Sequence, residues 1–268
     1  MSVEVGGRAS IGGRAFPADP PDEPRIRLRL LRGFELSCDH DAVDVPTSAQ
    51  RVVAFLALHD RSLLRTFVAG TLWPDVSERR SLASLRSALW RLHRLGLALL
   101  NATADHVELD QRVDVDHREA TSVARAILES SSDVEPEELE LLRLDGTLLP
   151  DWYDDWVFIE RERLLQLRLH ALERLSGRLV SAGRFAEAVE AALAAVNAEP
   201  LRESAHRALI SVYLAEGNAA SAIRQYELYR RLLAHELQVA PSGLMEDLMA
   251  SSSCQGQLQA GARLSALR

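Results

Sequence analysis

Arginine side chains gather on one predicted helix, from about Ser77 to Leu95. Five arginines fall there, at positions 79, 80, 86, 91 and 94. Leucines 82, 85, 89 and 92 recur at spacings of three and four and predict a single apolar stripe, with the arginines largely off it. A guanidinium is a planar fork of N–H donors that pairs with phosphate oxygens or with a guanine edge. The chemistry that this helix suggests is hydrogen bonding to nucleic acid.

The residues of this helix are expected to have different roles in contacting bases and phosphates. We expect Arg86 and Arg91 to offer bidentate hydrogen bonds to guanine, and Ser84 and Ser87 to be small enough for close approach. The remaining three arginines, Arg79, Arg80 and Arg94, are better placed for phosphates. Phosphate contacts give affinity and salt dependence rather than sequence choice. The other interpretation is that these arginines only solvate a surface.

The net charge of −8 hides a split along the chain. Residues 25–100 hold twelve arginines and seven acids, a net charge of +5. Residues 101–268 hold seventeen arginines and twenty-eight acids, a net charge of −11. All 31 basic residues are arginine, so every phosphate contact would use a guanidinium. This asymmetry is typical of a basic binding module joined to an acidic one.

Residues 25–112, which follow an N-terminal arm, have the pattern of a winged helix. Apolar and basic residues alternate from Arg25 to Leu30 and predict a strand, followed by a second strand at Phe34–Leu36, a turn at Asp39–Asp41 and a return strand at Val43–Val45. Three helices follow, one capped by Thr47 or Ser48 and running to about Asp60, one at Thr66–Trp73, and the arginine-rich helix ending at Gly96. Two short strands, Leu97–Leu100 and His106–Leu109, then predict a terminal hairpin.

The second half of the chain is predicted to be helical from 116 to 250. Asp116 and Glu119 fit a capping box, residues 130–133 form a loop, and helices are expected at Glu135–Leu144 and Glu160–Val180. A 34-residue repeat follows, in which six residues recur as similar residues: Ala171, Leu175, Leu179, Gly183, Ala188 and Val189 as Ala205, Leu209, Tyr213, Gly217, Ala222 and Ile223. A helix–turn–helix unit of this period, with glycine at the turn, is the signature of TPR repeats.

The expected fold class is therefore mainly α with a small N-terminal antiparallel β component. We expect a disordered arm at 1–24, a winged-helix DNA-binding domain at 25–112, a TPR-like helical domain at 113–250 and a flexible tail at 251–268.

No residue pattern in the chain predicts catalysis. The cluster from Asp151 to Trp156 pairs carboxylates with aromatic rings as a sugar-binding cleft does, but Trp152 and Trp156 packing between the domains is the simpler interpretation. Asp114 and Asp116 fit a strand end and a helix cap better than a metal pair. We expect no enzyme, metal or cofactor, and the two separate cysteines, the missing signal sequence and the missing apolar span predict a cytoplasmic protein.

Residues 26–250 resemble the SARP/AfsR family of bacterial regulators, an OmpR/PhoB-like winged helix joined to a bacterial transcriptional activator domain. The segments that carry the resemblance are residues 28–36, 49–58, 72–75, 85–92, 200–203, 226–233 and 236–242. The resemblance implies a sequence-specific DNA-binding regulator, an activator that binds direct repeats near promoters, often as a side-by-side homodimer, and recruits RNA polymerase holoenzyme.

The wing departs from the family pattern. Family wings carry a Gly-Tyr-Arg-like tip whose arginine approaches the minor groove, whereas this chain has His106-Val107-Glu108-Leu109. Phosphates would repel Glu108 if it faced DNA. This departure and the net charge of −8 motivate a second hypothesis, a TPR-like protein-interaction module whose winged helix does not bind DNA.

Overall fold

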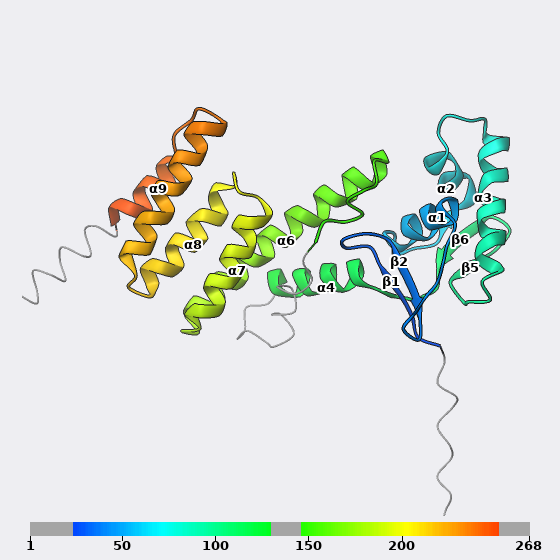
Figure 1. Cartoon of the computed structure of the whole chain (residues 1–268), viewed down its shortest axis with the longest axis horizontal. Coiled ribbons are helices and arrows are strands. Elements are labelled where there is room, and N and C mark those ends of the chain that lie inside the picture. Colours follow the sequence, from blue (N-terminus) through cyan, green and yellow to red (C-terminus); the bar gives the residue numbers. More distant parts are fainter. Residues whose placement is uncertain (1–23, 130–145, 252–268) are drawn as a thin grey trace, which may run out of the picture.

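The computed structural model describes residues 24–129 and 146–251 of the chain. A mixed α/β part and a stack of antiparallel helices lie at opposite ends of an elongated molecule (Figure 1). Most of the expected N-terminal arm and C-terminal tail, the predicted loop at 130–133 and the predicted helix at Glu135–Leu144 lie outside the described residues. No helix within the described ranges is long and apolar enough to span a bilayer.

The N-terminal sheet has the strand order β3-β2-β1-β7. Strand β1 (Ile26–Arg29) pairs antiparallel with β2 (Glu35–Cys38) and parallel with β7 (Asp114–Val115). The alternation predicted for β1 is confirmed, since Ile26 and Leu28 are buried and the arginines between them are exposed. The return strand predicted at Val43–Val45 is instead β3 (Asp41–Ala42). Asp39 and His40 both adopt positive φ (50° and 78°), so a two-residue turn starts the pairing earlier.

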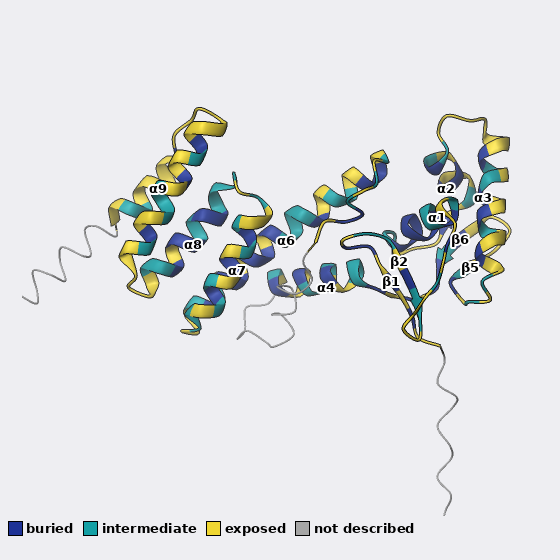
Figure 2. Cartoon of the chain, viewed as in Figure 1, coloured by how far each residue is buried: buried dark blue, intermediate teal, exposed yellow. Residues whose placement is uncertain are grey.

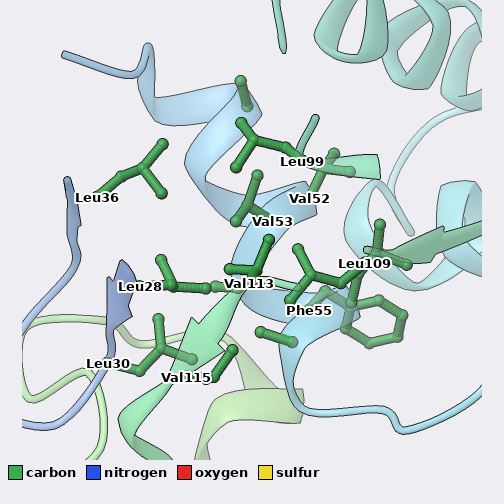
Figure 3. Packing of buried hydrophobic residues seen from close by; sticks show 14 of the residues in the cluster. Leu28, Leu30, Leu36, Val52, Val53, Phe55, Leu99, Leu109, Val113 and Val115 are labelled. Atoms are coloured by element: carbon green, nitrogen blue, oxygen red, sulfur yellow. The ribbon is translucent and has the colours of Figure 1, made fainter. Parts of the chain in front are cut away.

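Three helices follow this part of the sheet in the chain: α1 (Thr47–Ala57), α2 (Arg65–Leu72) and α3 (Glu78–His93). Helices α2 and α3 pack against each other and against α1. Helix α1 is the centre of the core, because Val52, Val53 and Phe55 pack among residues of this sheet, such as Leu28, and residues of the terminal hairpin, such as Leu109 (Figure 3). The predicted cap of this helix is wrong. Pro46 occupies the N-cap position without a side-chain hydrogen bond, since its fixed φ already suits the entry to a helix. The Ser48 hydroxyl bonds to α3 instead.

The terminal hairpin forms a second sheet with the strand order β4-β6-β5. Strand β6 (His106–Leu109) is where the alternation predicts it, whereas β5 (Leu100–Ala102) begins three residues later than expected. Leu99 is buried at that point, and its carbonyl accepts a hydrogen bond from Asp110 N. Strand β4 (Leu63–Leu64), which the sequence does not predict, pairs with β6. Together the hairpin and the three helices form a winged helix.

The second half of the chain is a helical stack. It contains α4 (Asp116–Glu129), α6 (Asp155–Ser181), α7 (Phe185–Ala198), α8 (Glu203–Ala215), α9 (Ala219–Glu236) and a last helix over residues 243–251. Helix α4 leads from β7 directly into this stack (Figure 1). The Asp116 carboxylate accepts hydrogen bonds from Leu30 N (2.9 Å) and Leu31 N (3.0 Å), and so fastens the start of α4 to the end of β1.

The predicted 34-residue repeat is confirmed in the hairpins α6–α7 and α8–α9. Gly183 and Gly217 both end a helix at positive φ, 71° and 83°, where a side chain would strain the backbone. The next residue donates its N–H to the same place in each repeat, Arg184 N to Leu179 O and Asn218 N to Tyr213 O. Ala188 and Ala222 are fully buried in the second helix of each pair.

The N-terminal turns of α6 belong to the core of the winged helix. Helix α6 begins five residues before the predicted Glu160, because Trp156 and Val157 are buried there with the hydrophobic residues of α1. Trp156 meets Phe55 edge to face at a ring-centroid distance of 5.2 Å, and Trp152 stacks on Phe34 at 6.1 Å. The aromatic packing expected between the two parts is thus confirmed. The domain boundaries at 24/25, 112/113 and 250/251 stay predictions.

Candidate nucleic-acid interface

Helix α3 buries one side and presents the other to solvent. Leu85 and Leu92 are the buried leucines of the predicted stripe, whereas Leu82 and Leu89 are only half-buried. The buried line also includes Ser81 and Ala88, so its centre is rotated slightly from the leucines. Figure 2 shows α3 at the edge of the molecule with exposed residues along its length. The apolar side holds the helix on the winged-helix core and leaves the opposite side free for a ligand.

The seven residues predicted to contact DNA lie on this helix or at its C-cap. All five arginines and Ser87 are exposed, and Ser84 is half-buried. By helical spacing they form two rows. One row contains Arg80, Ser84, Ser87 and Arg91, and the other contains Arg79, Arg86 and Arg94 together with the exposed Trp90. The structure therefore brings all seven to the solvent side or the flank of one helix.

The α3 arginines are not neutralised by acids. Within residues 24–129 and 146–251, no aspartate or glutamate forms an ion pair with Arg79, Arg80, Arg86, Arg91 or Arg94. Other arginines of the basic half do have acid partners. Arg29 lies 3.5 Å from Glu35, and Arg51 pairs with Asp154. Among the described arginines of residues 25–100 that have no acid partner, most therefore lie on α3; the others are Arg25, Arg61 and Arg65.

Two contacts position α3 arginines without removing their charge. Arg91 Nη1 donates to the Ser48 hydroxyl of α1 at 2.8 Å, which holds the guanidinium beside the start of that helix. Arg94 lies over the indole of Trp90, 4.9 Å from the ring centroid. Ser87 donates its hydroxyl to Ala83 O, four residues earlier, and keeps its lone pairs as acceptors.

Trp90 is the residue of this surface that the sequence prediction missed. Its side chain is 58% exposed, although tryptophan is usually mostly buried. The signal was an aromatic residue four positions from both Arg86 and Arg94, on the same side of a helix. An exposed indole among guanidinium groups adds an apolar contact surface to a basic one.

The wing hairpin follows α3 and has a different character. Its tip, Thr103–Asp105, is closed by a hydrogen bond from Thr103 N to His106 O at 2.9 Å. No arginine lies between residues 100 and 109. Glu108 is half-buried on β6, opposite Asn101 of β5. That this wing does not contact DNA, or weakens binding, stays a prediction.

One of the carboxylates that suggested a sugar-binding cleft has a structural partner. Asp154 pairs with Arg51, whose guanidinium also lies 5.9 Å from the ring centroid of Trp73. In the part of the chain that the structure describes, no three histidine, cysteine, aspartate or glutamate side chains gather as metal ligands would. The described site is a basic helix surface.

Known proteins share this architecture. Residues 137–251 match the family model of the bacterial transcriptional activator domain. The regulatory protein AfsR of Streptomyces coelicolor is 26% identical over 246 residues, which cover 87% of this chain and 25% of AfsR. The chain thus spans a quarter of the length of that relative.

A solved structure shows the same fold. EmbR of Mycobacterium tuberculosis, determined in complex with a low-affinity phosphopeptide, matches with a TM-score of 0.67 and 20% identity over 91% of this chain and 71% of that chain. A winged helix is thus followed by a TPR-like helical domain that includes the matched activator domain. The activator-domain match, the similarity to AfsR and the shared fold support a bacterial transcriptional regulator of the SARP/AfsR type.

Proposed function

We propose that this regulator binds promoter DNA in a sequence-specific manner through α3 and acts as a transcriptional activator. The observation that carries the proposal is the set of five exposed arginines on one side of α3, none of which pairs with an acid among the described residues. An α-helix fits the major groove of B-DNA, and the buried side of α3, which includes Leu85 and Leu92, anchors the helix so that its outer side can enter that groove.

The proposed roles of the α3 residues differ, and each role draws on both rows. Arg86 and Arg91 read guanine by bidentate pairing, and the hydrogen bond to Ser48 fixes the direction in which Arg91 approaches. Ser84 and Ser87 allow the helix to come close to the base edges. Arg79, Arg80 and Arg94 bind phosphates, which supplies affinity that falls as salt rises.

Recruitment of RNA polymerase holoenzyme and pairing of two copies on direct repeats complete the proposal. Both come from the family and not from the geometry of α3. The acidic helical stack is separate from α3, so self-association or a partner protein can use it while α3 occupies DNA (Figure 1).

The competing function is a protein-interaction module whose winged helix does not bind DNA. The wing favours it, because Asp105 and Glu108 stand where the family carries a basic tip. This alternative predicts a stable protein partner and no DNA affinity that depends on salt.

Binding to the DNA upstream of the chain's own gene cluster separates the two functions. We expect the full chain to shift this DNA in a mobility assay at low salt, to lose affinity steeply as salt rises, and to be retained on heparin. Absence of a shift at low salt, together with flow-through on heparin, would contradict DNA binding and favour the interaction module.

A further inference from the structure

A hollow lies between the end of α1 in the winged helix and helices α4 and α6 of the helical stack. Its volume is about 580 Å³, within the range of small-molecule sites. Helix α4 forms one wall and α6 the other, and Leu58 and Asp60, which follow α1, close the end. We call it the interdomain pocket; its lining comprises Leu58, Asp60, His117, Arg118, Thr121, Ser122, Arg125, Ala126, Glu129, Glu160, Arg163, Leu164 and Leu167.

Some charged side chains that line the interdomain pocket have ion-pair partners and others have none among the described residues. Arg118 lies 2.9 Å from Asp60, and Arg163 lies 2.8 Å from Glu160, so two of the three lining arginines have acid partners. Within the described ranges, Arg125 has no ion pair, and neither does Glu129 one turn further along α4. Arg125 is therefore the cation that is open to an anionic ligand.

Neutral polar groups lie close to this cation. Thr121 and Ser122 offer hydroxyls on the turn of α4 before Arg125. His117 also lines the pocket, and its Nδ1 is buried without a hydrogen-bond partner among the described residues. Burial lowers the pKa of His117 to about 4, so the imidazole is neutral near pH 7. A buried ring nitrogen without a partner is costly, and a polar group of a ligand would satisfy it.

The lining also limits the charge and shape of the ligand. Asp60, Glu129 and Glu160 would repel a doubly charged phosphate more than a singly charged carboxylate. Leu58, Leu164 and Leu167 offer an apolar surface to the body of the ligand. We propose that the interdomain pocket binds a small organic monocarboxylate with an apolar body, whose carboxylate pairs with Arg125.

Such a ligand would act on the arrangement of the two parts. Leu58 and Asp60 belong to the winged helix and directly follow α1, whereas α4 and α6 belong to the helical stack. A bound molecule that contacts both stabilises one arrangement, and any difference between the bound and free arrangements changes DNA affinity. This regulatory part rests on the proposed DNA binding; the binding site itself does not.

Thermal unfolding of the full chain tests the site without DNA. We expect phenylpropionate and isocaproate to raise Tm by about 3–6 °C at a tenfold excess over Kd. Their amides, phenylpropionamide and isocaproamide, should give no rise at the same ionic strength. The Arg125→Gln variant should lose the response, because it removes the cation that pairs with the carboxylate. Arg125 is exposed, so its replacement leaves the fold intact. The matched variant Arg224→Gln, exposed on α9, should keep it.

Three results would overturn the proposal or its regulatory part. The site would be excluded if neither carboxylate changed Tm up to its solubility limit and neither shifted the NMR resonances of the His117 ring. An undiminished Tm response in Arg125→Gln would exclude the assigned cation. Binding of the carboxylates without any change in the affinity of the chain for its upstream DNA would exclude the regulatory part alone. Failure of the chain to bind DNA at all would leave the first two measurements intact.

Discussion

The variant Arg86→Ala/Arg91→Ala is expected to bind the upstream DNA about a hundredfold more weakly than the unchanged chain. Each bidentate arginine–guanine pair contributes about 1–3 kcal/mol of discrimination, and two such pairs are lost. Discrimination between that DNA and a scrambled duplex should fall with the affinity. Fluorescence anisotropy with both duplexes at one fixed salt concentration measures the two quantities together.

A matched control separates the position of the charges from their number. The variant Arg224→Ala/Arg231→Ala also removes two positive charges, but from exposed residues of α9. We expect it to bind DNA within about twofold of the unchanged chain, since long-range charges are screened at physiological salt. Equal losses in the two double variants would mean that net charge, and not the face of α3, determines the binding.

The variant Trp156→Ala is expected to lower the free energy of unfolding by about 3–5 kcal/mol. Trp156 is only 9% exposed and fills the space beside Phe55 at the join between the winged helix and α6. Removal of the indole leaves a cavity in the core that both parts share, so the transition should also become less cooperative. Denaturant unfolding followed by circular dichroism measures both effects.

Tyr153 provides the comparison for this effect. It precedes α6 by two residues, but its side chain is 79% exposed. We expect Tyr153→Ala to change the free energy of unfolding by about 0.5 kcal/mol or less. A loss in Trp156→Ala no larger than that in Tyr153→Ala would show that the two parts do not depend on this aromatic contact.

Local periodicity made much of this fold predictable. The two repeats of the helical stack follow from residues spaced 34 apart, because glycine at positive φ and alanine at close helix crossings are required by the backbone itself. The strand β1 follows from its two-residue alternation in the same way. The exposure of the α3 arginines also follows from spacing, since a leucine stripe on one side leaves the other side to solvent.

Features that depend on distant partners escaped the prediction. Strand β4 is two leucines that become a strand only when they pair with β6, more than forty residues later. The early start of α6 depends on Trp156 finding Phe55. The bond between Arg91 and Ser48, and the interdomain pocket between α4, α6 and the end of α1, likewise depend on how the elements pack. No spacing within one segment encodes such contacts.

The salt dependence of DNA binding tests the central claim most directly, because it counts the phosphates that the protein neutralises. The slope of log Kobs against log salt is expected to be less steep by about 2.7 in the variant Arg79→Ala/Arg80→Ala/Arg94→Ala, since each lost phosphate contact removes about 0.9. Identical slopes for this variant and the unchanged chain would mean that α3 does not contact the DNA backbone, and would contradict the account.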